Sequence, residues 1–189
     1  LTTGASPRPM PAGFSGLNGV FELRSLADVD RMRDRFSAGA RMVVIGGGFI
    51  GLETAAVAAQ TGLQVTIVEM AERILERVVC PQTSGYFRDL HEGKGVRIME
   101  GRAVSDVIGN GRIEAVELND GNRIEADLVL LGIGVLPDTD LARQADIATD
   151  NGILVDQRGR TSAPGVWAAG DCAAFPLNGE ITRLESVQN

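Results

Sequence analysis

The sequence has few of the features that mark membrane, extracellular or nucleic-acid-binding proteins. It contains no apolar run long enough to cross a bilayer. Its two cysteines, Cys80 and Cys172, lie far apart and no secretory signal precedes them, so we expect a reducing cytoplasm and no disulfide framework. The formal net charge of −7 argues against nucleic-acid binding, which needs a basic face. We expect the only histidine, His91, to be structural.

The remaining composition is that of a globular chain. Its 189 residues are 44% hydrophobic and 23% charged, which allows a sizeable core in one or two domains. The chain begins with Leu1, and Leu1 to Gly4 is typical of the end of a strand running into a turn. We therefore expect the chain to be a piece of a longer protein.

The stretch from Arg41 to Glu69 carries the strongest pattern. It begins with an apolar, β-branched run, Met42–Ile45, followed by the glycine turn Gly46-x-Gly48-x-x-Gly51. An Ala-rich segment with apolar residues at helical spacing comes next, and then a second strand-like run, Val65–Val68. This order predicts a βαβ unit with a dinucleotide-binding fingerprint. A glycine-rich turn can also be only a turn, but here strand, turn, helix, strand and terminal acid occur together.

Each part of this fingerprint has a physical task. Gly46 allows the tight strand-to-helix turn, Gly48 lets the backbone approach a pyrophosphate, and Gly51 lets the helix pack closely on the strand. The phosphates would then bind free N–H groups at the helix N-terminus. Glu69 can accept hydrogen bonds from a ribose diol and would repel a 2′-phosphate, which favours NAD(H) over NADP(H).

The segments on either side of this unit give weaker signals. Prolines and glycines between residues 5 and 19 indicate a linker or irregular crossover. Ser25 and Asp28 form a capping-box pattern that predicts a helix to about Ser37, ended by Gly39. A second helix is expected over Pro81–Glu92, with a strand after it at 96–99.

Beyond residue 100 the pattern changes to short strands. Runs at 103–108, 112–118 and 123–131, separated by Gly-Asn-Gly and Asn-Asp-Gly, predict an antiparallel meander attached to the parallel sheet. The end of the last run, 127–131, is apolar enough to be buried on both faces and leads into a turn at 132–137. Short strands at 153–155 and 166–169 follow, and the second would present Asp171 at the mouth of a sheet. An Asp after a Gly is more often only a cap or turn residue.

Five motifs together identify a family resemblance: TTGASPRP, GGGFIGLE, GIGVLP, TSAPGVWAAGDCA and RLESVQN. They resemble the FAD-dependent pyridine nucleotide-disulfide oxidoreductases, and most closely the NADH-dependent ferredoxin reductases of the putidaredoxin reductase and biphenyl dioxygenase reductase type. The resemblance implies an α/β, Rossmann-like FAD/NAD(P)-binding fold. It covers the middle portion of such a protein: an FAD-side segment at 1–38, an NAD(H)-binding domain at 39–150 and a return segment of the FAD-binding domain at 151–189.

The resemblance also implies roles for individual residues. The residues implied to contact NAD are Gly46, Gly48, Ile50, Gly51, Glu53, Glu69, Arg77 and Gly134. Among these, Glu53 would meet the nicotinamide amide, and the alternative is a solvent-exposed carboxylate on a helix. Arg77 would lie near the adenosine end, although an exposed ion pair with a neighbouring glutamate is nearly as plausible.

The residues implied to contact FAD are Thr3, Gly4, Arg8, Asp171 and Val187. Asp138 departs from the asparagine that is frequent in the family after Pro137, so no role is assigned to it. Because the glycine turn that holds the FAD pyrophosphate in this family is not among these motifs, the FAD site in this chain is expected to be incomplete. No metal site and no side-chain nucleophile are expected.

The implied activity is that of an NADH:ferredoxin oxidoreductase, which takes hydride from NADH to FAD and then passes single electrons to a [2Fe–2S] ferredoxin or a rubredoxin. A disulfide reductase with a close cysteine pair in the NADH domain is excluded, because Cys80 has no near neighbour. A pair preceding Leu1 stays open, although RLESVQN argues against it. The alternative from another class is a non-catalytic NAD-binding module.

Overall fold

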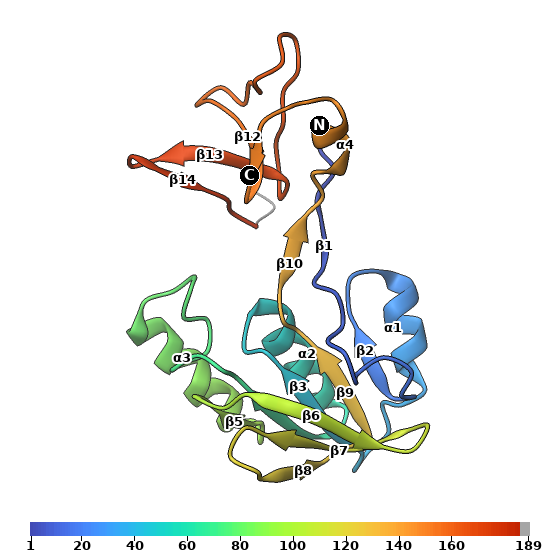
Figure 1. Cartoon of the computed structure of the whole chain (residues 1–189). Coiled ribbons are helices and arrows are strands. Elements are labelled where there is room, and N and C mark those ends of the chain that lie inside the picture. The colour runs from blue at the N-terminus through green and yellow to red at the C-terminus, as the bar shows by residue number, and fades with distance from the viewer. Residues whose placement is uncertain (186–189) are drawn as a thin grey trace. The chain divides into compact units, whose positions relative to one another are not determined.

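The computed structural model describes residues 1–185 of the chain (Figure 1). It forms two compact units. The larger unit is Pro9–Gly134, and the smaller one joins Leu1–Arg8 to the segment that begins at Val135. Val187, one of the expected FAD contacts, lies outside the described residues. The functional division at residues 38 and 150 stays a prediction.

The larger unit is built on a parallel sheet of five strands. In spatial order these are β2 (Val20–Glu22), β9 (Leu128–Leu131), β3 (Arg41–Ile45), β4 (Gln64–Val68) and β5 (Arg97–Met99). Every pair of neighbours is parallel. Three helices connect these strands: α1 (Leu26–Arg33), α2 (Phe49–Gln60) and α3 (Pro81–Glu92). The expected α/β fold with a parallel sheet is confirmed.

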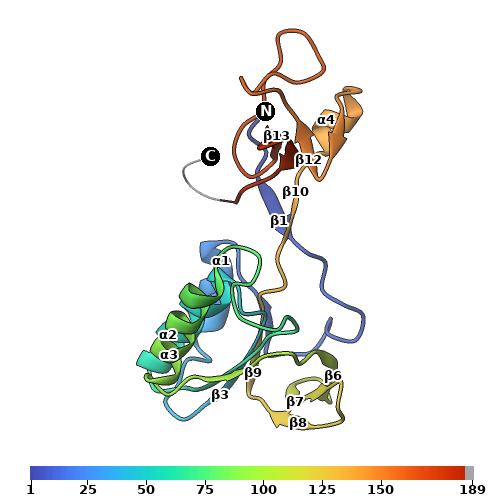
Figure 2. The same cartoon turned by 90° about the vertical axis from the view of Figure 1, so that its left-hand side faces the viewer.

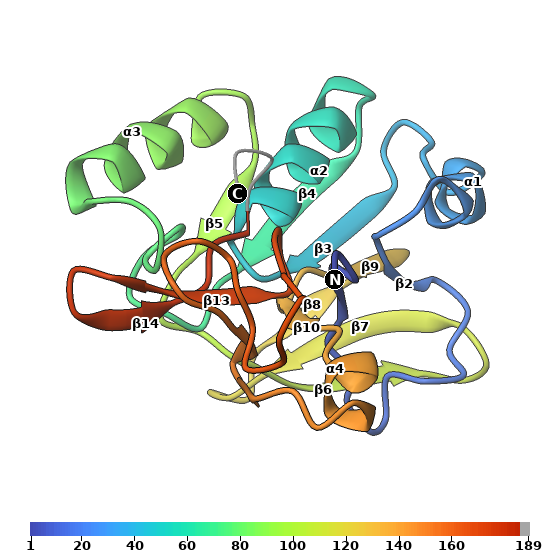
Figure 3. The same cartoon turned by 90° about the horizontal axis from the view of Figure 1, so that it is seen from above.

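The two faces of the sheet pack against different layers. Met42 and Val44 of β3 join the core with the helices, while Val43 between them joins the core with an antiparallel meander. Figures 2 and 3 show the helices along one side of the sheet and the meander along the other. Because successive side chains of a strand point to opposite faces, burial on both sides requires an unbroken apolar run.

The meander consists of β6 (Val104–Gly109), β7 (Ile113–Leu118) and β8 (Arg123–Glu125). We expected one strand over 123–131, and this was wrong: β8 belongs to the meander and β9 to the parallel sheet. The chain changes layers at Ala126 and Asp127, where regular pairing stops. Asp127 is instead held by Arg41, at the start of β3.

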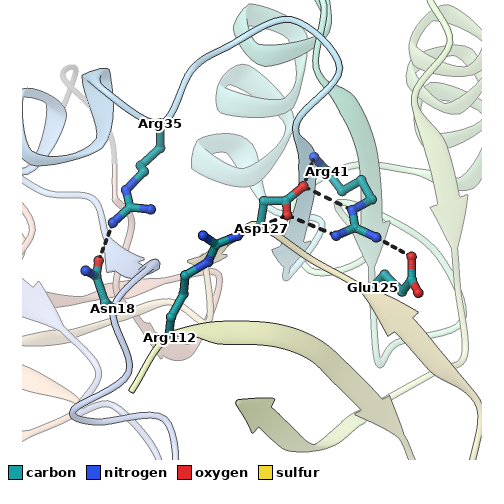
Figure 4. Close-up of polar contacts among 6 residues, drawn as sticks. All are labelled: Asn18, Arg35, Arg41, Arg112, Glu125 and Asp127. Atoms are coloured by element: carbon teal, nitrogen blue, oxygen red, sulfur yellow. Dashed lines mark hydrogen bonds and ion pairs between the residues drawn. The ribbon is translucent and has the colours of Figure 1, made fainter. Parts of the chain in front are cut away.

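Asp127 and Arg41 form the centre of a charged network at the amino ends of the strands (Figure 4). The Asp127 carboxylate accepts hydrogen bonds from Arg41 Nε at 3.0 Å, Nη2 at 2.9 Å and the backbone N–H at 2.9 Å. Arg41 also pairs with Glu125, and Arg112 lies 3.6 Å from Asp127. The network therefore joins β3 to the end of the meander.

The first helix is shorter than expected. The prediction that Gly39 ends it was wrong, because α1 stops at Arg33 and Asp34 caps it. The next residues form single turns, with Arg35 N–H bonded to the Met32 carbonyl and Phe36 N–H to that of Arg33. The capping pattern at its start is confirmed: Asp28 Oδ2 accepts from the Ser25 N–H at 2.7 Å.

The smaller unit contains a two-stranded ladder and a four-stranded sheet. The ladder pairs β1 (Ala5–Pro7) with β10 (Val135–Pro137) in antiparallel order. After helix α4 (Asp140–Gln144), the sheet contains β11 (Thr149–Asp150), β12 (Gly152–Leu154), β13 (Ala173–Leu177) and β14 (Glu180–Thr182). Its core includes Ile147, Ile153 and Cys172.

Three expectations for this unit were wrong. Residues 1–4 are not a strand, since β1 begins after Gly4, whose φ is +73°. The expected linker at 5–7 and turn at 135–137 are strands, because they pair with each other. The expected strand at 166–169 does not form, because Trp167 makes only an isolated bridge with Arg160. The neighbouring backbone bonds join this segment to residues 159, 161 and 1 without extending the bridge into a ladder.

Among residues 1–185, no helix has both the length and the apolar character needed to cross a membrane.

Candidate functional site

The carboxyl ends of the parallel strands gather the residues of the candidate site. Gly46 follows β3, Glu69 follows β4, Glu100 follows β5 and Gly132 follows β9. Because these strands are parallel, all four residues lie at one edge of the sheet. From β3 the chain adds β4 and β5 on one side of that strand, and it later adds β9 on the other side. Ligands of open α/β sheets bind at such a point, where the order of the strands reverses.

Two of the three fingerprint glycines are required by close backbone contacts. A Cβ atom on Gly46 would lie 2.3 Å from the carbonyl oxygen of Gly132, and the φ of Gly46 is +108°. A Cβ atom on Gly51 would lie 2.2 Å from the carbonyl oxygen of Gly46. The backbones of β3, β9 and α2 thus approach one another so closely at these two glycines that no side chain fits there.

Gly48 differs from the other two because the space beside it is open. Apart from Gly48 and its two chain neighbours, no heavy atom of the described residues lies within 4 Å of the position of a Cβ on Gly48. Gly48 is the N-cap of α2, and the first N–H groups of a helix have no acceptor within it. The first turn of α2 carries no acidic residue. The open space and the donors together suit a pyrophosphate.

Glu69 lies against the glycine turn and is half-buried. Its Oε2 accepts a hydrogen bond from the Gly47 N–H at 2.6 Å, and its Oε1 accepts one from the Ala71 N–H at 2.7 Å. An ionised carboxylate has about four acceptor positions, so each oxygen can still accept one hydrogen bond from a hydroxyl group. The position suits recognition of a ribose diol beside the pyrophosphate turn.

Ile50 and Glu53 lie on the exposed side of the first turns of α2. They border a hollow of about 260 Å³ between α2 and the start of α1, which Leu23, Arg24, Ser25, Val29, Ile50, Glu53 and Thr54 line. Glu53 is exposed, so its carboxylate is accessible at the same end of the sheet as the glycine turn. This placement is compatible with the expected contact to a nicotinamide amide.

Arg77 and Gly134 are the two remaining expected NAD contacts. Arg77 is exposed in the segment between β4 and α3. Gly134 is the last residue of the larger unit and has φ of +93°, a conformation that favours glycine. Their roles stay predictions.

The sequence patterns missed Gly47 as a site residue. A Cβ atom on Gly47 would lie 2.6 Å from Cγ2 of Ile74 and 3.3 Å from Oε2 of Glu69. Gly47 stands at the variable position of the fingerprint, so the motif itself assigns it no task. The three consecutive glycines were the only sequence signal that could have indicated this close packing.

The expected FAD contacts lie in the smaller unit. Thr3 donates its hydroxyl hydrogen to the carbonyl oxygen of Asp138, and Gly4 accepts from the Asp138 N–H at 2.9 Å. Arg8 is exposed. Asp171 is half-buried, follows Gly170 at φ of +80°, and its carbonyl oxygen accepts from Arg183 Nη1 at 3.1 Å.

The smaller unit also has a hollow of its own. It measures about 520 Å³, and its lining is mostly apolar or small: Val155, Asp156, Gln157, Gly159, Ala168, Ala169, Gly170, Ala173, Phe175, Pro176, Leu177 and Asn178. Its lining includes the small residues 168–170, immediately before Asp171. A hollow of this character can accept an apolar group or another piece of backbone.

The parallel sheet, the glycine turn and the acid after β4 define the class of α/β dinucleotide-binding proteins. Within that class, the chain belongs to the pyridine nucleotide-disulphide oxidoreductase family, which matches it over residues 1–189.

Comparison with individual proteins confirms the resemblance to ferredoxin reductases. The chain is 41% identical to putidaredoxin reductase of Pseudomonas putida, over 100% of this chain and 47% of that protein. It is 42% identical to the ferredoxin–NAD(+) reductase component of the biphenyl dioxygenase system of Paraburkholderia xenovorans, again over 100% and 47%. A crystal structure of the covalent putidaredoxin reductase–putidaredoxin complex matches with a TM-score of 0.93 at 41% identity, over 100% of this chain and 47% of that one. The chain thus spans about half the length of these relatives.

Proposed function

We propose that this chain is the NAD(H)-binding part of an NADH:ferredoxin oxidoreductase and contributes part of an FAD site. The observation that supports it most is the arrangement around Gly48. Open space, free helix N–H groups and the Glu69 carboxylate adjoin one another at the carboxyl edge of the sheet. Together they provide for both the anionic and the ribose parts of a dinucleotide.

On the nucleotide side, each group has a separate task. The N–H groups at the start of α2 would hold the pyrophosphate, and Glu69 would accept hydrogen bonds from the adenosine ribose. Ile50 would pack beside the pyrophosphate turn, and Glu53 would meet the nicotinamide amide. Glu69 would also disfavour a 2′-phosphate, because two negative groups would then be close together.

On the flavin side, Thr3, Gly4, Arg8 and Asp171 would contribute to binding FAD. When both cofactors are bound, they supply hydride transfer from the nicotinamide to the flavin and single-electron transfer onward. Relatives named for putidaredoxin and rubredoxin support an iron-containing electron acceptor of this kind, a [2Fe–2S] ferredoxin or a rubredoxin.

A reducing cytoplasm is part of the same proposal. Both cysteines are free thiols, Cys80 exposed and Cys172 buried. The Thr83 hydroxyl, 3.3 Å from Cys80 Sγ, lowers the pKa of that thiol. An exposed thiol of this kind persists most readily in a reducing compartment.

A non-catalytic NAD-binding module is the second candidate. The observation that favours it is that the strand, glycine turn, helix and acid of the candidate nucleotide site all lie within the larger unit. Flavin absorbance of the purified chain separates the two candidates. A yellow preparation supports the enzyme, and a colourless one supports the module.

Titration of NADH and NADPH tests the proposal. We expect tighter binding of NADH, and Glu69→Gln should reduce the preference by about 10-fold, since hydrogen bonds to a charged acceptor are the stronger class. Glu114→Gln, an exposed site on β7, is the control for loss of one charge and should leave both affinities unchanged. Equal affinities of the parent chain for the two nucleotides would contradict the assignment of Glu69.

A further inference from the structure

The segment between β4 and α3, residues 70–79, is fastened to the glycine turn at two consecutive residues. The side chain of Ile74 is fully buried and fills the space that a Cβ on Gly47 would occupy. The N–H of Leu75 donates to the carbonyl oxygen of Gly47 at 3.0 Å. Gly47 is therefore covered by this segment, which we call the Ile74 segment.

Ile74 is held by groups from two further elements. Its N–H donates to Oε1 of Glu100, directly after β5, at 2.8 Å. Its carbonyl oxygen accepts from Oγ of Ser84 in α3 at 2.7 Å, and Ser84 is fully buried. Both backbone polar groups of Ile74 are thus satisfied by side chains, as buried polar groups require.

Leu75 adopts a backbone conformation that is unfavourable for its side chain. Its φ is +54°, in the left-handed region, although it carries a γ-branched side chain that is only 4% exposed. Such a conformation persists only where the surroundings impose it, and it is found most often at functional sites. The N–H of this residue is the group that donates to the Gly47 carbonyl oxygen.

Gly47 connects this segment to the acid of the candidate site. Its N–H donates to Oε2 of Glu69 at 2.6 Å, while its carbonyl oxygen accepts from Leu75. The backbone next to Glu69 is also bonded to the chain after β5, through Gly101 N–H to the Ala71 carbonyl at 2.8 Å and Arg102 N–H to the Glu69 carbonyl at 3.0 Å. A displacement of Ile74 would therefore change the position of Gly47 and of the carboxylate bonded to it.

We propose that Glu100 is a positioning residue for dinucleotide recognition. It fixes Ile74, and through Leu75 and Gly47 it holds the Glu69 carboxylate in the orientation that discriminates a ribose diol from a 2′-phosphate. This inference rests on the proposed function. Glu100 does not itself contact the nucleotide in this arrangement.

The surroundings of Glu100 suit a fixed anchor. Its side chain is 18% exposed and pairs with Arg88 Nη2 of α3 at 2.7 Å. One carboxylate thus joins β5, α3 and the Ile74 segment. A charged acceptor for a backbone N–H gives a shorter and stronger bond than a neutral one, which limits movement of Ile74.

The test measures nucleotide affinities and amide exchange on the full 189-residue chain. We expect Glu100→Ala to weaken NADH binding by about 10-fold and NADPH binding less, so that the preference for NADH decreases. Glu100→Gln keeps an oxygen for the Ile74 N–H and should restore the preference to within about 2-fold of the parent. Glu117→Ala, which removes the carboxylate paired with Arg123 at 2.9 Å in the meander, is the matched control and should leave the preference unchanged.

Hydrogen exchange provides a readout without any nucleotide. Glu100→Ala should accelerate exchange of the Gly47 and Leu75 amides, whereas Glu117→Ala should not. Unchanged exchange at Gly47, or an unchanged preference for NADH in a folded Glu100→Ala chain, would overturn the inference. If Glu100→Ala does not fold, Ser84→Ala removes the other hydrogen bond to Ile74 and must show the same two effects. Failure of the parent chain to bind NADH, with exchange at Gly47 responding as expected, would reject the proposed function and leave the positioning of Gly47 supported.

Discussion

The two units of the molecule differ in how their candidate sites are assembled. In the larger unit, strand, glycine turn, helix and acid follow one another between Arg41 and Glu69, and the sheet is covered on both faces. In the smaller unit, the candidate FAD contacts come from both ends of the described chain, and residues 166–169 form no regular ladder. A contiguous site can be complete within one unit, whereas a site assembled from distant segments depends on each of them.

The largest expected effect is a difference in stability between alanine substitutions at two glycines of the same turn. Gly46→Ala places a methyl group against the Gly132 carbonyl in a left-handed conformation, and we expect it to lower the free energy of unfolding by about 2 kcal/mol or more. Gly48→Ala meets open space, so it should change stability by about 0.5 kcal/mol or less while weakening NADH binding. Urea unfolding and NADH titration of both variants check this. Equal loss of stability would mean that the turn is packed differently.

The second prediction compares the two cofactors directly. We expect the chain to bind NAD(H) but to hold FAD weakly or not at all, because the expected FAD contacts do not include a glycine turn for the FAD pyrophosphate. Binding a cofactor costs the entropy of ordering it, and the remaining contacts alone would have to offset that cost. Two isothermal titrations, one with each cofactor, measure the difference. Tight, stoichiometric FAD binding would contradict the prediction and indicate that a second copy of the chain completes the site.

The third prediction tests the larger unit at the edge away from the candidate site. Hydrogen bonds from the Arg41 side chain lower the pKa of Asp127 from 3.8 to about 2. Because the pKa is lower in the folded state, this carboxylate stabilises the fold above pH 3.8, and the contribution is lost as the pH falls through about 2. Asp127→Asn should cost about 1–2 kcal/mol at neutral pH and flatten the acid side of the stability curve.

Asp30→Asn is the control for this measurement. Asp30 makes an exposed ion pair with Arg33 at 3.1 Å, and its loss should change stability by only a few tenths of a kcal/mol, as is usual for surface pairs. Urea unfolding over a pH series measures both variants. The same acid dependence in Asp127→Asn as in the parent would show that another group causes it.

The smallest effect is expected at the start of α1. Asp28 accepts hydrogen bonds from the N–H groups of Ser25 at 2.7 Å and Arg24 at 3.0 Å, and the first of these contributes most to lowering its pKa. Asp28→Ala should reduce stability by about 1 kcal/mol without changing NADH affinity. Thermal unfolding measures the loss. A concurrent loss of affinity would instead connect this helix start to the hollow beside Glu53.

The sequence predicted those elements whose signals are local. The two strands between Arg41 and Glu69 and helix α3 were predicted almost to the residue, and a helix was expected between the strands, because glycines, proline and apolar runs mark these elements. The change of sheet at Asp127 was not predictable, since no glycine or proline divides the strand-like run at 123–131. It depends on Arg41, which lies 86 positions away in the chain.

The same distinction applies to the candidate site. Gly46, Gly48, Gly51 and Glu69 belong to a motif with fixed spacing, so the sequence alone indicated them. Glu100 belongs to no motif, and its contact with Ile74 spans 26 positions. Residues that act through another residue's backbone carry no local pattern. They become visible only when the chain is folded.

His91 gives the larger unit a natural spectroscopic reporter. The ring is buried on α3, with Nδ1 2.8 Å from the Phe87 carbonyl oxygen and Nε2 3.2 Å from that of Leu52 in α2. Since it is the only histidine in the chain, its imidazole signals in a nitrogen-15 NMR spectrum need no assignment. Those signals depend on the distance between His91 Nε2 and the Leu52 carbonyl oxygen, so they would register a shift of α2 relative to α3. No further probe has to be introduced by mutation. Nucleotide binding at the N-terminus of α2 could thus be followed from inside the protein.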